Sequence, residues 1–160
     1  MLDVKSLSVS INGNKILQEV NFTVKKNEFL AIVGQSGSGK SITAYSLLKL
    51  LPELEIAKTA QVKFYNHDLT KISEQEFNQI RGRDIAMIFQ EPMSSLNPLH
   101  NFGKQIAEAI TIKNPLITKQ QLRTQVKELL TMVGLEVLHN RLAELPHQLS
   151  GGQRQRVMIA

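Results

Sequence analysis

The chain has 160 residues, of which 42% are hydrophobic and 21% charged, a composition typical of a folded globular protein rather than a disordered one. It contains no cysteine, which excludes disulfides and thiolate metal sites, and its four histidines never stand at a metal-binding helical spacing. The net charge of +5 comes from 19 basic residues interspersed with 14 acidic ones, so we expect no nucleic-acid partner. Because no apolar run is long enough to span a membrane and no charged leader precedes one, we expect a cytoplasmic protein.

The N-terminal part of the chain predicts strands. Apolar residues share one side over residues 4–11, apart from one register slip, and a second apolar stretch covers 16–24. The turn-forming Asn12-Gly13-Asn14 lies between them, which favours an antiparallel hairpin. The continuous apolar run FLAIV (29–33) is typical of a strand buried on both faces, and we expect it in a parallel sheet.

Helix and strand patterns alternate in the middle of the chain. SITAYSLLKLL (41–51) has helical apolar spacing and should end at Pro52. VKFYN (62–66) and DIAMIF (84–89) are further predicted strands, the second of them in the same parallel sheet.

The remaining segments predict helices with recognisable ends. Between the two strands, Ser73 can cap a helix and Glu76 can complete a capping box. From residue 102 to 145 the pattern is helical, with breaks at Asn114-Pro115 and Gly134. The chain shows no internal repeat and no low-complexity tract.

The sequence GQSGSGKS (34–41) fits the G-x-x-x-x-G-K-[ST] phosphate loop. Glycines let the backbone curl so that N–H groups point at phosphate oxygens, and the helix beginning near Gly39 adds its positive dipole end. Lys40 can reach the β- and γ-phosphates, and the Ser41 hydroxyl can coordinate Mg²⁺. A flexible linker is the alternative, but a linker would not lie between a buried strand and an apolar helix. The predicted phosphate-binding residues are Gly34, Gln35, Ser36, Gly37, Ser38, Gly39, Lys40, Ser41 and Ile42.

A second motif, LSGGQ (149–153), precedes the helical RQRVMIA. Taken alone, it is a capped helix start, with Ser150 as the N-cap. Alongside a phosphate loop, a serine hydroxyl, two bare glycine amides and a helix N-terminus together predict a second phosphate-recognising surface. Its residues are Leu149, Ser150, Gly151, Gly152 and Gln153.

These motifs together resemble the ATP-binding subunits of ABC transporters over essentially the whole chain. GQSGSGKS is similar to the family's Walker A loop, IFQ ending at Gln90 to its Q-loop, and LSGGQ to its signature motif, in the family's order. The stretches FQEPMSSLNPLH (89–100) and PHQLSGGQRQRVMIA (146–160) are similar to the uptake branch that carries peptides, nickel or microcin.

The resemblance implies an α/β fold, a P-loop NTPase of ABC type with an antiparallel hairpin, a partial parallel sheet core and a helical subdomain. Residues 1–98 would hold the hairpin, the phosphate-loop core and the Q-loop. Residues 99–148 would form the helical subdomain, and 149–160 the signature motif with the start of its helix.

The resemblance also implies the cofactors, partners and activity. Such a subunit couples ATP binding and hydrolysis, with Mg²⁺, to the uptake of peptide-like solutes through transmembrane permease subunits. Gln90 would contact the Mg²⁺ and the attacking water, although an ordinary surface glutamine is the alternative. A second ABC subunit or domain would pair head to tail, so that one LSGGQ motif closes over the ATP held by the other chain. The subunit would be peripheral on the inner face of the cell membrane.

Two departures from the family pattern limit these expectations. Ile11 stands where relatives commonly place an aromatic residue against adenine, so the contact to the base stays open. After RVMIA the family continues with the Walker B strand and its catalytic Glu, which leads us to expect that this chain is an N-terminal fragment without ATPase turnover of its own. A non-catalytic nucleotide-binding remnant and a non-transport ABC ATPase remain alternatives.

Overall fold

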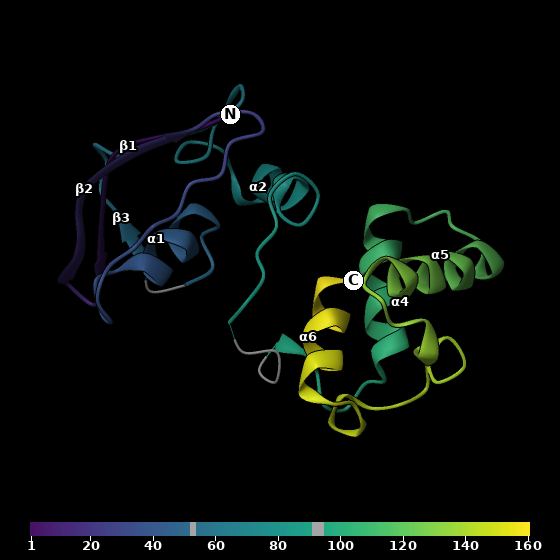
Figure 1. Ribbon diagram of the computed structural model, residues 1–160. Coiled ribbons are helices and arrows are strands. Elements are labelled where there is room, and N and C mark those ends of the chain that lie inside the picture. Colours follow the sequence, from purple (N-terminus) through teal and green to yellow (C-terminus); the bar gives the residue numbers. More distant parts are fainter. Residues whose placement is uncertain (52–53, 91–94) are drawn as a thin grey trace. The chain divides into compact units, whose positions relative to one another are not determined.

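The computed structural model describes residues 1–51, 54–90 and 95–160. The chain divides into two units, Met1–Ala86 and Met87–Ala160 (Figure 1). The first unit contains all the strands and the first helices of the described chain, and the second is helical.

The predicted N-terminal hairpin is confirmed. Strand β1 (Leu2–Ile11) pairs antiparallel with β2 (Asn14–Val24). The two residues between them, Asn12 and Gly13, both have positive φ, at 50° and 76°. A two-residue turn of this kind matches the twist of the strands that it joins, which is why Asn-Gly is a strong hairpin signal.

A bulge at Ser6 explains the register slip in β1. Val4 pairs with Phe22 and Leu7 with Val20, so β1 uses one more residue than β2 between these two pairs. Ser6 takes up the extra residue with a φ of 48°. Val4 and Leu7 would face opposite sides of a regular strand, but the bulge turns both side chains into the core, where they are 1% and 0% exposed.

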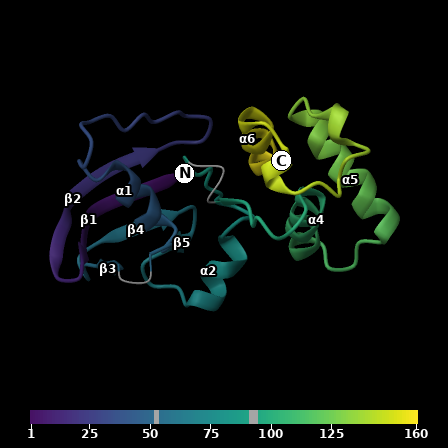
Figure 2. The same ribbon diagram turned by 90° about the horizontal axis from the view of Figure 1, so that it is seen from below.

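The other strands extend the same antiparallel sheet (Figure 2). β4 (Gln61–Phe64) pairs with β1, which confirms most of the strand predicted at 62–66. β3 (Leu54–Ile56) pairs with β1 further along, and the short β5 (His67–Asp68) pairs with β4. The path through the sheet is therefore β2-β1-β4-β5, with β3 off this path.

The two predicted parallel strands are absent from the described residues. Residues 29–33 form no strand, and the Phe29 side chain is 100% exposed. Residues 84–89 also form none, apart from one isolated parallel bridge between Arg81 and Ile85. Both predictions are wrong for this structure because a strand exists only when another segment supplies a ladder of backbone hydrogen bonds, and no such ladder forms along either run in the described part of the chain.

Helix α2 (Glu74–Ile80) confirms the predicted capping box. The Glu76 N–H donates to Ser73 Oγ at 3.3 Å, and the Ser73 N–H donates to Glu76 Oε2 at 2.9 Å. Hydrogen bonds from Ser73 also lower the pKa of the Glu76 carboxyl below its usual value, because they stabilise the charged form.

Helix α1 (Lys40–Leu47) is shorter than the predicted 41–51. It ends where Lys49 adopts a left-handed conformation, with a φ of 48°, and the Leu50 N–H donates back to the carbonyl of Tyr45 at 3.1 Å. This arrangement satisfies carbonyls of the last turn, so no proline is needed to end the helix. Pro52 lies outside the described residues.

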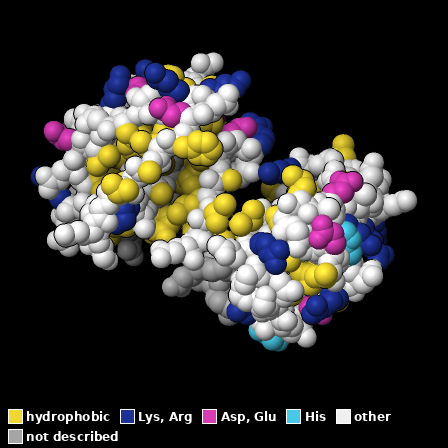
Figure 3. Space-filling view, viewed as in Figure 1, with side chains coloured by type: hydrophobic (Ala, Val, Ile, Leu, Met, Phe, Trp, Pro, Cys, Tyr) yellow, Lys and Arg dark blue, Asp and Glu magenta, His cyan; other side chains and the backbone are white. Residues whose placement is uncertain are grey.

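Apolar side chains of the sheet, α1 and α2 form the core of the first unit. The fully or nearly buried members are Val4, Leu7, Val9, Leu17, Ala60, Val62, Leu69, Phe77 and Ile80. Other apolar side chains of this unit remain at the surface, and Figure 3 shows apolar side chains gathered on one of its faces.

The second unit contains α4 (Phe102–Lys113), α5 (Lys119–Met132) and α6 (Gly151–Ile159). Two short 3₁₀ turns, Glu136–Leu138 and Pro146–Gln148, lie between α5 and α6. Its buried core includes Phe102, Ile106, Val126, Leu130, Leu135, Leu138, Leu149 and Val157. Among the residues that the structure describes, no helix is both long and apolar enough to cross a membrane.

Both predicted helix breaks in this unit are confirmed. Asn114 is the C-cap of α4, and Gly134 follows α5 with a φ of 68°. The helix between the breaks begins at a further capping box, in which Thr118 accepts from the Gln121 N–H at 3.3 Å.

Candidate functional site

The phosphate loop lies at the exposed start of α1. Residues 34–38 are exposed, and Gly39, the N-cap of α1, is left-handed with a φ of 88°. No side chain caps this helix, and the first helical hydrogen bond runs from the Thr43 N–H to Gly39 O at 2.8 Å. The preceding N–H groups of the helix therefore remain open to an anion, which the helix dipole also favours.

The loop glycines are required for three different reasons. Gly37 has a φ of 79° with nothing within 4 Å of the place of a Cβ, so the left-handed backbone alone favours glycine there. A Cβ on Gly39 would lie 2.5 Å from Leu17 Cδ2, and one on Gly34 would lie 2.7 Å from Ser38 Oγ. The backbone of Gly39 thus lies close to the Leu17 side chain of β2, and the backbone of Gly34 lies close to the Ser38 side chain of the same loop.

Lys40 holds the curled loop together. Its ammonium donates to Gly34 O at 2.9 Å and Gln35 O at 2.7 Å, with Ser38 Oγ at 3.4 Å. A cation thus lies inside a backbone ring next to open helix N–H groups, an arrangement that complements the negative charge and the acceptor oxygens of a phosphate. The residues present fit a nucleotide's phosphates.

The other predicted site residues are placed as follows. Ser41 is exposed on the first turn of α1, and Ile42 is half-buried against the core of the first unit. Gln90 is exposed and belongs to the second unit. The following Glu91 and the rest of its E-P-M-S segment, 91–94, lie outside the described residues.

The LSGGQ segment is a capped helix start. Ser150 is the N-cap of α6: its Oγ accepts from the Gln153 N–H at 3.2 Å, and its own N–H donates to Gln153 Oε1 at 2.9 Å. Leu149 is buried and anchors the segment. Gly151 and Gly152 are exposed, and a Cβ on either would meet nothing within 4 Å. Packing within this unit therefore does not require glycine at these two positions.

Sequence reasoning missed two arginines that support these motifs. In the second unit, Arg156 Nη1 donates to Gly134 O at 2.9 Å, which ties α6 to the turn after α5. In the first unit, Arg81 Nε donates to Leu48 O at 3.2 Å and Nη1 to Asn78 Oδ1 at 2.6 Å. The first of these bonds ties the end of α1 to the end of α2, and the second lies within α2 and its C-cap. For Arg156, the sequence signal is the spacing of basic residues after LSGGQ. For Arg81, no local sequence pattern indicates the contact.

A sheet-supported phosphate loop followed by a separate helical unit defines a P-loop nucleotide-binding protein. The chain belongs to the ABC transporter family, because the model of that family matches residues 17–160. Solved structures give the same fold. The dimeric structure of MJ0796, described as a bacterial ABC transporter cassette, matches with a TM-score of 0.82 and 29% identity, over 99% of this chain and 67% of that one. The predicted P-loop NTPase fold of ABC type is therefore confirmed, apart from the two parallel strands that the described residues do not form.

Curated relatives with known names are similar over the whole chain. The oligopeptide transport ATP-binding protein OppD of Bacillus subtilis (strain 168) is 43% identical over 100% of this chain and 46% of its own length. The dipeptide transport ATP-binding protein DppD of the same organism is 41% identical, over 100% of this chain and 49% of its own length. The chain thus spans about half the length of these relatives. MJ0796 in a post-hydrolysis state bound to ADP and Pi is 28% identical, with a TM-score of 0.79, over 99% of this chain and 67% of that one.

Proposed function

We propose that the chain is the nucleotide-binding part of an ABC transporter subunit that couples ATP binding and hydrolysis to the uptake of peptide-like solutes. The observation that carries this proposal is the phosphate loop, with the Lys40 ammonium inside the curled backbone and open N–H groups at the start of α1. The names of OppD and DppD support the peptide class.

In this proposal, residues 34–42 hold the phosphates of ATP. The Lys40 ammonium exchanges the neutral carbonyls of Gly34 and Gln35 for negatively charged β- and γ-phosphate oxygens, so both partners of each new contact are charged. The Ser41 hydroxyl and Gln90 are the proposed Mg²⁺ contacts, and Gln90 also orients the attacking water. Bound Mg²⁺ would neutralise negative charge on the phosphate oxygens.

We propose that LSGGQ closes over the ATP of a second ABC subunit or domain, head to tail. The exposed, unobstructed Gly151 and Gly152 support a close backbone approach by a ligand. Residues 99–148 would be the helical subdomain that presents this motif, and 1–98 the hairpin, phosphate-loop core and Q-loop. Permease subunits would be the membrane partner and would hold the protein on the cytoplasmic face. The dimeric MJ0796 structures support the pairing.

A non-catalytic nucleotide-binding remnant is the main alternative, and a non-transport ABC ATPase is the second. Measuring phosphate release by the full-length gene product distinguishes an ATP-hydrolysing protein from one that only binds nucleotide. Reconstitution with its permease in vesicles separates transport from other ATPase functions.

The first test of the proposal is the Lys40→Ala variant. Hydrogen bonds to charged groups contribute about 1.5–3 kcal/mol, so this variant should bind a fluorescent ATP analogue about 10- to 150-fold more weakly. Lys15→Ala removes the same charge from an exposed position in β2 and should bind as the unmodified protein does. Equal affinity of the two variants would mean that residues 34–42 do not hold the phosphates.

A further inference from the structure

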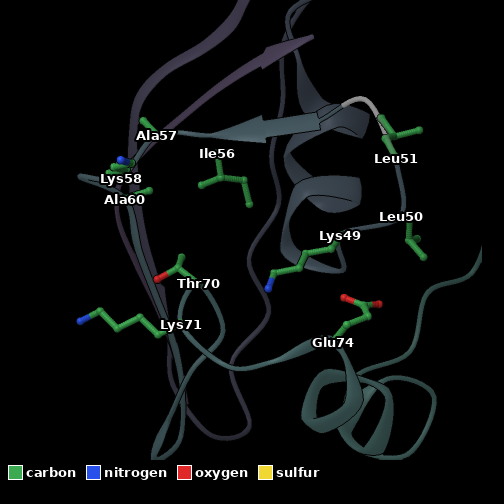
Figure 4. Close-up of a pocket in the computed structure, with 10 residues that line it drawn as sticks. All are labelled: Lys49, Leu50, Leu51, Ile56, Ala57, Lys58, Ala60, Thr70, Lys71 and Glu74. Carbon is green, nitrogen blue, oxygen red and sulfur yellow. The ribbon is translucent and has the colours of Figure 1, made fainter.

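A cavity lies in the first unit, at the opposite end of α1 from the phosphate loop. The cavity has a volume of about 740 Å³, within the range of roughly 300–1,000 Å³ typical of small-molecule sites. Its walls come from the residues after α1, from the β3 end and the loop after it, and from the segment leading into α2. Figure 4 shows these residues surrounding a common space.

The cavity combines an aliphatic wall with charged groups. Ile56, Ala57 and Ala60 form the aliphatic side, and Ala60 is buried. In Figure 4 the Lys49 side chain extends into the space between Ile56 and Glu74. A site built in this way can hold a ligand with an apolar body and one charged group.

The charges favour an anionic ligand. Among the described residues, Lys49, Lys58 and Lys71 line the cavity together with one acidic residue, Glu74. The Glu74 carboxylate already forms an ion pair with Arg81 Nη2 at 2.9 Å. Its negative charge is therefore shared with Arg81 and does not balance the positive charge of the three lysines. Lys71 forms an ion pair with Asp68, which is not one of the described lining residues, and Figure 4 shows the Lys49 side chain reaching into the space.

The backbone of Lys49 supports a role for its side chain. Its φ of 48° is the left-handed conformation that follows a helix and that glycine adopts with less strain. The lysine is nevertheless present, and its ammonium lies 5.0 Å from the centre of the buried Phe77 ring. This cation–π contact orients the ammonium without using an acceptor atom, so its N–H groups can still donate to a ligand.

We propose that this cavity binds a small organic anion with an aliphatic body. Lys49 contacts the anionic group, and Ile56, Ala57 and Ala60 contact the body. A carboxylate and a phosphate ester share this chemistry. The inference is independent of the proposed ATPase function, and its test is carried out without nucleotide.

The test uses methyl NMR titrations of the full-length gene product. Hexanoate and hexyl phosphate carry the two anionic groups on the same body, and each should cause saturable shifts at the methyl groups of Ile56, Ala57 and Ala60. The probe that binds with the lower Kd identifies the anionic group that the cavity prefers. Hexylammonium has the same body with the opposite charge, and acetate lacks the body, so neither should saturate at comparable concentrations. Saturation by hexylammonium as strong as that by hexanoate would overturn the proposal.

Two opposite substitutions separate the charge effect from misfolding. Lys49→Met keeps the length of the side chain and should weaken binding by about tenfold or more, because a charge-assisted contact is lost. Glu74→Gln removes the acidic residue found among the described residues of the lining and should strengthen binding several-fold, which a damaged fold could not do. Lys26→Met, which changes the same charge at an exposed position outside the lining, should leave the affinity unchanged. Equal affinities of the Lys49, Glu74 and Lys26 variants would refute the assignment.

Discussion

Substituting Gly39 by Ala should destabilise the first unit more than the same change at Gly37. Both residues are left-handed, with φ of 88° and 79°. A non-glycine residue in this conformation costs about 1–2 kcal/mol. At Gly39 the added Cβ would also lie 2.5 Å from Leu17 Cδ2, whereas ordinary contacts begin at 3.4 Å, and at Gly37 it would meet nothing within 4 Å.

The difference between the two variants isolates the contact with Leu17. This side chain is 5% exposed within the core, so moving it aside repacks buried neighbours. Overpacking of this kind costs about 1–3 kcal/mol. We therefore expect a loss of about 2–5 kcal/mol for Gly39→Ala and about 1–2 kcal/mol for Gly37→Ala.

Urea denaturation followed by circular dichroism, without nucleotide, measures these free energies of unfolding. The control is the Leu17→Ala background, in which Gly39→Ala should cost only the left-handed conformation, about 1–2 kcal/mol. Equal losses for Gly39→Ala and Gly37→Ala, or an unchanged cost after Leu17 is removed, would refute the packing argument.

Three further outcomes follow from the structure. Ser150→Arg should leave ATP affinity unchanged but prevent ATP-driven dimerisation of a hydrolysis-blocked full-length protein, because a bulky cation would enter the proposed phosphate surface. Size-exclusion chromatography measures this, and normal dimerisation of the variant would contradict the head-to-tail pairing. Arg81→Met should cost about 1–2 kcal/mol in urea denaturation, since it removes the hydrogen bond to Leu48 O at the end of α1 and the bond to Asn78 within α2, and an unchanged midpoint would mean that these contacts add nothing. Ser73→Ala should lower the melting temperature by a few degrees at neutral pH. The folded state lowers the pKa of the Glu76 carboxyl below 4.5, so its contribution to the free energy of unfolding is present above pH 4.5 and is lost as the pH falls through the lowered pKa. The difference in melting temperature between Ser73→Ala and the unmodified protein should therefore shrink over the same pH range. A constant difference would exclude this linkage.

Features that depend on neighbours in the sequence could be predicted. The Asn12-Gly13 turn, the capping box of Ser73 with Glu76 and the helix break at Gly134 all appear where the sequence places them. Each depends on hydrogen bonds or backbone preferences within a few residues, so the local pattern contains the information needed. The phosphate-loop motif is also read from local spacing, and the family is expected from the resemblance of three short motifs to known ones.

Features that depend on distant residues were decided only by the tertiary structure. The apolar run 29–33 predicted burial, but no described segment pairs with it, and it forms no strand. The contact of Arg81 with the end of α1 joins residues that are 33 positions apart, and no sequence pattern indicates it. The contact between Gly39 and Leu17 is of the same kind, since it brings the loop against a buried side chain of β2. An apolar or charged residue in the sequence indicates that it needs a partner, but only the folded chain determines which group comes close enough to be that partner.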